Sequence, residues 1–298
     1  MSTATEAVAA GASKAVKRVA VIGGGTMGNG IAQVFATNGF DVHLIETRQE
    51  FLDKALGNIG RNLERVAKKL NWETSQSGEV LKRIQGGVSL ETARNADLVV
   101  EAVTEDFSVK KQIFEQLDAL CPANTILASN TSSISITEIG AVTKRADRVI
   151  GMHFMNPVPV MQLVEIIRGL ATSNETYAIT EDLAKRLGKT TVEVHDYPGF
   201  VANRILMPMI NEACYTLMEG VATRDAIDTV MKLGMNHPMG PLALADLIGL
   251  DTCLSIMEVL HEGFGDSKYR PCPLLRKMVK AGYLGRKTGR GFYEYVAS

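Results

Sequence analysis

The sequence predicts an α/β fold, in which a doubly wound, mostly parallel sheet is followed by an all-helical region. Short runs rich in β-branched residues alternate with amphipathic helical patterns from Arg18 onward. A glycine-rich turn joins the first of these runs to the first helical pattern, and the strand pattern stops near Asp196. The chain has 298 residues, 46% of them apolar, which is enough for one large domain or two ordinary ones.

Five short segments are expected as strands, because each is rich in Val and Ile and is bounded by helical patterns. In chain order they are RVAVIG, DVHLIE, DLVVEAV, TILASN and RVIGMHF. A charged stretch at about residues 48–85 separates the second from the third, and it is far longer than an ordinary connection between a strand and a helix. We expect it to form a pair of helices that projects from the sheet.

The domain boundary is predicted at the turn DYPG, just after a last strand, TTVEVH. Residues 17–198 would then form the sheet domain with its helical arm, and residues 199–298 an all-helical domain. The wide apolar, methionine-rich faces of the second region favour a homodimer formed through it. Residues 1–16 have no continuous apolar run and only Lys14 as a basic residue, so we expect a flexible tail and no targeting signal.

Composition excludes several classes of partner. The 32 basic and 33 acidic side chains give a formal net charge of -1, so no overall field attracts nucleic acid or an anionic membrane. No window reaches the roughly 18 consecutive apolar residues of a membrane span. The four cysteines are far apart and lack the paired spacing of a metal site, which favours reduced thiols and a cytoplasmic location; they are Cys121, Cys214, Cys253 and Cys272.

The glycine-rich turn matches the spacing GxGxxG, with glycines at 23, 25 and 28, and it has the required context of strand, turn and helix. The first glycine permits the tight turn, the second lets the backbone approach a pyrophosphate, and the third allows close packing of helix on strand. Thr26 and Met27 complete the turn, whose helix N-terminus would face the phosphates. The pattern predicts a Rossmann-type dinucleotide site.

Glu46 strengthens this interpretation, because it ends the second strand about twenty residues beyond the glycines, where a carboxylate can bind the adenosine ribose hydroxyls. The same carboxylate would repel a 2′-phosphate, which favours NAD over NADP. Arg48 argues in the opposite direction, because an arginine near this position is what a phosphate-tolerant site uses. In another context Glu46 would be interpreted as a helix-start carboxylate that complements the dipole.

A second group of residues surrounds His153, at the end of the strand RVIGMHF. A proline-bearing loop follows, and then a further strand that contains Glu165. In a hairpin centred on Pro159, His153 and Glu165 would be cross-strand neighbours. An ionised glutamate within LVEII is costly to bury unless it is paired, and the histidine is the nearest candidate partner.

A carboxylate beside a histidine fixes the tautomer and stabilises the imidazolium, which suits a base that takes a proton from a hydroxyl while hydride leaves the same carbon. A lone histidine at a strand end would more often be a structural residue. The apolar flanks of Glu165 favour the acid–base interpretation here.

Several motifs together resemble those of the L-3-hydroxyacyl-CoA dehydrogenases, and among these the bacterial 3-hydroxybutyryl-CoA dehydrogenases. The resemblance runs from about residue 17 to the C-terminus and rests on the glycine turn, SNTSS at 129–133, GMHFMNPVPVMQLVEII, PGFVANRI and GRKTGRGFYEY. It implies an oxidoreductase that interconverts (S)-3-hydroxyacyl-CoA and 3-ketoacyl-CoA with NAD, and it implies no metal.

The resemblance also implies residue roles. His153 would be the catalytic base and Glu165 its orienting partner, while Ser132 and Asn203 would hydrogen-bond the substrate oxygen or the thioester carbonyl. In other contexts the latter two would be a turn serine and a helix N-cap. The nicotinamide half of the cofactor would be approached by Glu105, Lys110, Ser132, Asn156 and Lys287.

For coenzyme A, the resemblance places a serine and a lysine on the projecting helices. Lys69 matches the lysine, whereas Asn62 stands where the family has serine, so this contact departs from the pattern. Without the resemblance, Glu105 and Lys110 would be interpreted as an ordinary solvated helix start, and Lys68 and Lys69 as a solvated helix face.

Two alternatives stay open at this point. One is a dehydrogenase of a free hydroxy or sugar acid, of the gulonate type, although the segment around His153 offers no arginine for a carboxylate. The other is a non-catalytic, crystallin-like binding protein on the same scaffold, although all four positions Ser132, His153, Glu165 and Asn203 are filled. Acyl-chain length and the direction of the reaction, in fatty-acid or butanoate metabolism, are not fixed by the sequence.

Overall fold

A computed structural model describes residues 16–70, 72 and 74–295, so the expected tail lies outside the described residues except for Val16. The chain divides into two compact units. Of the described residues, the first unit contains those from Val16 to Thr131 together with Ile136–Glu193, and the second contains Ser132–Ser135 together with those from Val194 to Tyr295.

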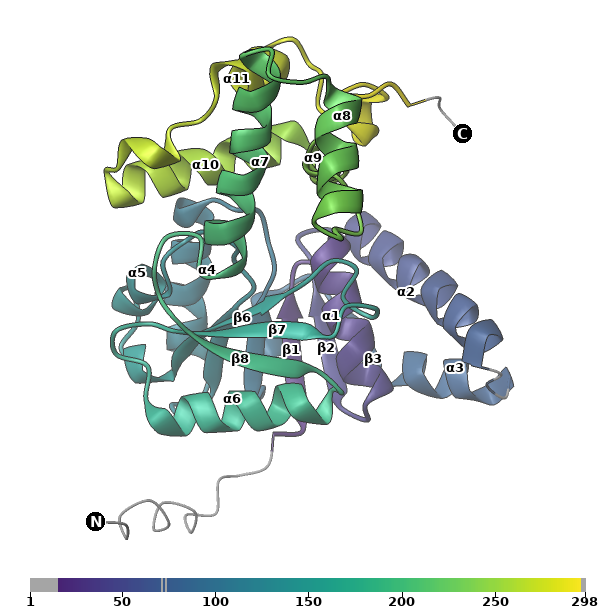
Figure 1. Ribbon diagram of the computed structural model, residues 1–298. Coiled ribbons are helices and arrows are strands. Elements are labelled where there is room, and N and C mark those ends of the chain that lie inside the picture. The colour runs from purple at the N-terminus through teal and green to yellow at the C-terminus, as the bar shows by residue number, and fades with distance from the viewer. Residues whose placement is uncertain (1–15, 71, 73, 296–298) are drawn as a thin grey trace, which may run out of the picture. The chain divides into compact units, whose positions relative to one another are not determined.

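One sheet organises the first unit (Figure 1). Among the described residues it has eight strands in the order β3-β2-β1-β4-β5-β6-β7-β8. The pairs from β3 through to β6 are parallel, and β6 and β7 form an antiparallel hairpin. The strands are β1 (Arg18–Ile22), β2 (Asp41–Ile45), β3 (Ile84–Gly87), β4 (Leu98–Glu101), β5 (Ile126–Ser129), β6 (Val149–Phe154), β7 (Leu163–Arg168) and β8 (Thr190–His195).

The predicted fold class is confirmed, and each of the five predicted strands and the last strand TTVEVH is present. The sequence did not predict the short strand β3, which begins at Ile84, at the end of the segment of about 48–85, and pairs in parallel with β2. Its sequence, IQGG, contains two glycines and no run of β-branched residues, so it lacked a strand signal.

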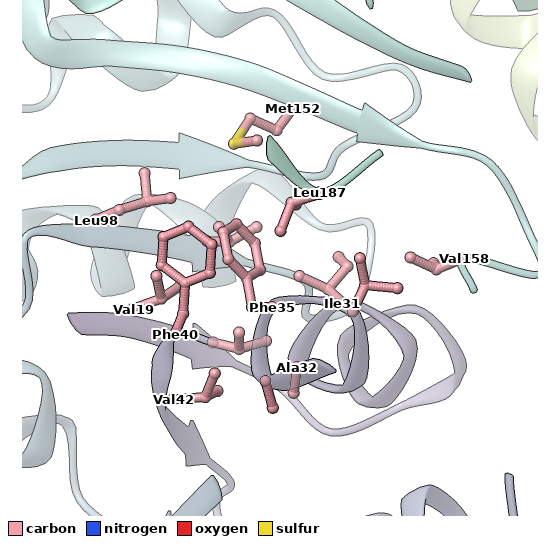
Figure 2. Close-up of a cluster of buried hydrophobic side chains, with 14 of the residues drawn as sticks. Val19, Ile31, Ala32, Phe35, Phe40, Val42, Leu98, Met152, Val158 and Leu187 are labelled. Carbon is pink, nitrogen blue, oxygen red and sulfur yellow. The ribbon is translucent and has the colours of Figure 1, made fainter. Parts of the chain in front are cut away.

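The hydrophobic core of the first unit lies between the sheet and its helices. Strands β1, β4 and β5 are almost wholly buried because helices cover both faces, and their continuous apolar runs reflect this. Figure 2 shows side chains of α1, such as Ile31 and Phe35, in one cluster with Val19 of β1 and Leu98 of β4. The helices of this unit are α1 (Thr26–Thr37), α2 (Gln49–Leu70), α3 (Thr74–Lys82), α4 (Phe107–Leu120), α5 (Ile136–Ala141) and α6 (Asn174–Arg186).

The expected arm is the pair α2 and α3, which extends beyond the sheet (Figure 1). Its base is anchored because Leu52, Ala55, Ile59 and Leu63 recur at spacings of three and four on α2 and are buried in the core. The remaining faces of α2 are polar, so the helix presents charged side chains along its length.

The second unit is mainly helical, as predicted for the C-terminal region, and has its own core around Met207, Leu242 and Leu260. Buried Asp246 accepts hydrogen bonds from the backbone N–H groups of Phe292 and Tyr293, which fixes the C-terminal segment on this core. The helices are α7 (Ala202–Met218), α8 (Arg224–Thr229), a π-helical turn η3 (Val230–Gly234), α9 (Pro241–Ile248), α10 (Leu250–Phe264) and α11 (Pro273–Lys280).

Candidate active site

The glycine turn has the geometry that a bound pyrophosphate needs. Gly23 has a φ of +92°, and a Cβ at Gly28 would lie 1.7 Å from the carbonyl oxygen of Gly23, so both positions require glycine. Gly25 is the N-cap of α1, and a Cβ there would meet no atom within 4 Å. The helix N-terminus thus opens onto vacant space beside an exposed backbone, which fits the phosphates of a dinucleotide.

The flanks of the turn support the same ligand. Thr26 is exposed on the first turn of α1, while Met27 is half-buried and packs against the core. Glu46 follows β2 directly, and its Oε1 accepts a hydrogen bond of 2.7 Å from the N–H of Gly24. The carboxylate therefore faces the glycine turn, as a ribose-binding residue should, and does not cap a helix.

Arg48 makes its contacts with the first turn of α2. Its guanidinium forms a 3.1 Å ion pair with Glu50 and lies 5.1 Å from the centre of the Phe51 ring. These contacts account for the arginine without a 2′-phosphate, so the site fits NAD.

A buried network of hydrogen bonds lies at the carboxyl ends of β4 and β5. Glu101 accepts hydrogen bonds from Lys110 Nζ at 2.7 Å, from Ser129 Oγ at 2.6 Å and from the N–H of Val103 at 2.7 Å. Lys110 also lies 3.3 Å from Glu105. The side chain of Lys110 is 1% exposed, so it does not belong to the solvated helix start that its sequence would suggest without the family resemblance.

Sequence reasoning missed Glu101 and its place in this network. Glu101 lies beside the glycine turn. Its neighbour in sequence, Ala102, touches the turn, because a Cβ at Gly23 would lie 2.8 Å from the carbonyl oxygen of Ala102. The available signal was a charge at the end of a strand of buried apolar residues, DLVVE.

The hairpin brings His153 and Glu165 together. Positions 151 to 154 of β6 pair with 167 to 164 of β7, so the register expected from a centre at Pro159 is confirmed. His153 Nδ1 lies 2.7 Å from Glu165 Oε2, and the two side chains are 8% and 2% exposed. The glutamate thus holds one ring nitrogen of a buried imidazole, an arrangement that favours the tautomer with the hydrogen on Nδ1.

Ser132 and Asn203 are joined in the second unit. The Nδ2 of Asn203 donates a 2.9 Å hydrogen bond to the backbone carbonyl of Ser132, and Asn203 is buried on the first turn of α7. The N-cap of α7 is Val201, so Asn203 does not cap the helix. Lys287, in the same unit, forms a 2.6 Å ion pair with Asp251.

A polar cavity of about 290 Å³ lies between α1, α2 and the loop that joins β6 to β7. Asn62 and Asn156 both line it, together with Arg61 and Arg65, which sequence reasoning missed. Asn58, Arg61, Asn62 and Arg65 share one face of α2, because their spacings are three, one and three. Lys69 is exposed one turn beyond the cavity and does not line it.

None of the helices in the described part of the chain is long and apolar enough to cross a membrane.

Two family models match the chain. The NAD-binding domain of 3-hydroxyacyl-CoA dehydrogenase matches residues 18–197, and the C-terminal domain of the same family matches residues 199–295. The chain is 60% identical over 280 residues to a probable 3-hydroxybutyryl-CoA dehydrogenase of Bacillus subtilis, covering 94% of this chain and 98% of that protein. It is 42% identical to the human mitochondrial hydroxyacyl-coenzyme A dehydrogenase, covering 99% and 96% respectively.

A solved structure agrees with these sequence matches. The crystal structure of (S)-3-hydroxybutyryl-CoA dehydrogenase from Ralstonia eutropha superposes with a TM-score of 0.92 at 53% identity, and the match covers 95% of this chain and all of that one. With a dinucleotide turn that fits NAD and a buried histidine–glutamate pair in the first unit, the chain belongs to the 3-hydroxyacyl-CoA dehydrogenase family of NAD-dependent oxidoreductases.

Proposed function

We propose that this enzyme interconverts (S)-3-hydroxybutyryl-CoA and acetoacetyl-CoA, with His153 as the acid–base residue. The observation that carries the proposal is the contact of 2.7 Å between the imidazole of His153 and the carboxylate of Glu165. The short acyl chain follows the names of the bacterial relatives, since the cavity on α2 does not by itself select an acyl length.

In the oxidation direction, His153 removes the proton from the 3-hydroxyl group. Glu165 accepts a hydrogen bond from Nδ1, so the second nitrogen, Nε2, exchanges the proton with the substrate, and the carboxylate stabilises the resulting imidazolium. NAD⁺, held by the glycine turn and Glu46, would supply the acceptor for the hydride that leaves the same carbon. In the reduction direction the imidazolium returns the proton to the oxygen of the 3-ketone.

Ser132 and Asn203 hydrogen-bond the substrate in this proposal. A hydroxyl and an amide polarise a carbonyl without adding charge beside the nicotinamide. The bond from Asn203 Nδ2 to the backbone of Ser132 fixes the amide plane, which keeps the two groups in a constant arrangement.

The cofactor is held at both of its halves. Gly23, Gly25, Thr26, Met27 and Gly28 receive the pyrophosphate, and Glu46 receives the adenosine ribose. Glu105, with Lys110 behind it, faces the nicotinamide ribose, and Asn156 and Lys287 contribute to the same half.

The coenzyme A phosphates bind to the arm. Arg61 and Arg65 line the cavity with Asn62, and both carry a permanent charge in a geometry that matches phosphate. Lys69 continues the series, because positions 61, 65 and 69 follow the four-residue spacing of one helix face. The pair of arginines offsets the absence of the family's serine at Asn62.

The direct test is NADH oxidation by the purified protein with acetoacetyl-CoA, with NADPH and free acetoacetate in parallel assays. We expect turnover with NADH and the thioester alone. Activity on the free acid would favour a gulonate-type dehydrogenase, and activity with NADPH would contradict the role of Glu46. No turnover in any of these assays would favour a non-catalytic binding protein.

A homodimer through the second unit is also proposed. Large apolar side chains are exposed on α7 and on the π-helical turn, where Ile205 is 69% and Leu233 82% exposed. Light scattering should give twice the chain mass of 32.3 kDa, and Leu233→Lys should reduce the measured mass to that of one chain.

The four cysteines are buried and unpaired, which supports a reducing, cytoplasmic location.

A further inference from the structure

Lys189 is a buried lysine that none of the motifs includes. It follows Gly188, whose φ of +72° ends α6 in a left-handed turn. The N–H of Gly188 donates to the carbonyl of Lys185, and the N–H of Lys189 donates to that of Ala184, which is the Schellman pattern. The turn directs the lysine side chain back towards the unit's interior before β8 begins.

Within the described residues, the ammonium group of Lys189 donates to backbone carbonyls alone. Its Nζ donates to the carbonyl of Val158 at 2.6 Å and to that of Met161 at 2.7 Å, and the residue is 9% exposed. No carboxylate in the described part of the chain pairs with it, and burial lowers its pKa. A buried cation without a counter-ion is costly, so its carbonyl contacts must hold a defined backbone conformation.

The backbone that Lys189 holds is the loop between β6 and β7. Val158 is 1% exposed and belongs to the core cluster with Ile31 of α1 (Figure 2). Beneath it, a Cβ at Gly30 would lie 2.9 Å from the Cβ of Val158 and 3.5 Å from Cδ of Pro159. The loop is therefore held by two independent contacts. Lys189 binds its carbonyl groups, and Val158 packs against α1 at Gly30, where there is no side chain.

The same loop forms one wall of the cavity on the arm. Asn156, Pro157, Val158 and Pro159 line it, opposite Arg61 and Arg65 of α2. Displacing the loop would change the distance between this wall and the two guanidinium groups.

We propose that Lys189 is a positioning residue for the thioester substrate: by pinning the loop from Pro157 to Met161, it sets the width of the cavity that receives the nucleotide part of coenzyme A. The inference rests on the proposed function, because it takes the arm cavity as the coenzyme A site. It adds a residue that touches neither substrate nor cofactor.

The test compares two substrates at saturating NADH: acetoacetyl-CoA, and acetoacetyl-N-acetylcysteamine, which has the same reacting atoms but no nucleotide. In Lys189→Met we expect the KM for the CoA thioester to rise about tenfold or more, because two hydrogen bonds from a charged donor are lost. We expect the KM for the truncated thioester and both kcat values to stay close to those of the wild type. Lys185→Met, which removes an exposed lysine from the last turn of α6, is the matched control.

An equal rise of KM for both substrates, or no rise for either, would overturn the inference. Gly30→Ala keeps Lys189 but pushes the same loop outward, and it should produce the same selective rise, so the inference is testable even if Lys189→Met does not fold. A wild-type enzyme that uses both thioesters equally well would overturn it as well, while the dehydrogenase assignment would stand. Only failure of the wild type on both thioesters would contradict the proposed function itself.

Discussion

Two buried ion pairs of the first unit differ in what their charges can do. Glu101 and Lys110 are 0% and 1% exposed, and the glutamate accepts hydrogen bonds from three separate segments. His153 and Glu165 are nearly as buried, but this pair contains an imidazole, the side chain that most often serves as a general acid or base. We therefore expect the first pair to serve as a fixed framework beside the glycine turn, and the second to exchange a proton with the substrate.

The largest effect is expected from removing the exchangeable group. His153→Ala should lower kcat by roughly 10²–10⁴-fold, the usual contribution of a general acid–base group, and leave the affinity for NADH unchanged. Steady-state kinetics and a fluorescence titration with NADH measure the two quantities. His195→Ala, at an exposed histidine, is the matched control, and full activity in His153→Ala would refute the assignment.

Breaking the fixed pair should act on stability. Lys110→Met leaves Glu101 as an unpaired buried charge, so the free energy of unfolding should fall by about 3–5 kcal/mol. The double variant Glu101→Gln with Lys110→Met should recover part of this loss, because no buried charge is then left unpaired. Denaturant unfolding measures both, with Lys111→Met, an exposed neighbour, as control. A double variant less stable than the single one would contradict the framework role.

The partner of the histidine should matter less than the histidine. Glu165→Gln keeps the shape and one hydrogen bond but loses the negative charge that stabilises the imidazolium. The loss of a charged hydrogen bond is worth about 1.5–3 kcal/mol, so kcat should fall roughly 10- to 100-fold. If kcat were unchanged, Glu165 would be a structural partner only, and the contrast with Glu101 would disappear.

The smallest effect is expected at an exposed pair, Lys287 and Asp251, whose side chains are 47% and 39% exposed. Burial opposes the charge on Asp251, but hydrogen bonds from Lys287 and from the backbone of Thr252 outweigh it and lower its pKa below 3.8. A lowered carboxyl pKa stabilises the folded state above pH 3.8, and this contribution is lost as the pH falls through the folded-state pKa. Asp251→Asn should therefore cost less than about 1 kcal/mol at neutral pH and nothing in strong acid, measured by thermal unfolding. A larger cost that persists in acid would show that the pair is not the origin of the effect.

These pairs also show how far sequence reasoning reaches. The contact of His153 with Glu165 could be predicted, because a hairpin turns a distance along the chain into a register, and a glutamate between apolar residues needs a partner. The strands could be predicted for a similar reason, since β-branched runs such as RVAVI report burial on both faces directly.

Contacts that depend on how a helix packs against the sheet could not be predicted. Glu101 and Lys110 meet only because α4 returns over the end of β4, and their separation of nine residues matches no local period. Lys189 reaches Val158 across 31 residues, and nothing near it in the sequence distinguishes it from a surface lysine. Strand β3 was missed because IQGG is held by its pairing with β2 and not by its own preference.

Gly30 lies on the same helix, α1, as the glycine turn. In the proposed function, the N-terminus of this helix at Gly25 would face the dinucleotide phosphates, and five residues later the helix supports the loop that lines the arm cavity. One helix would therefore border two ligands, and a displacement of it by one ligand would change the affinity for the other. Linkage then requires reciprocity: the factor by which the dinucleotide changes the affinity for the thioester must equal the factor by which the thioester changes the affinity for the dinucleotide.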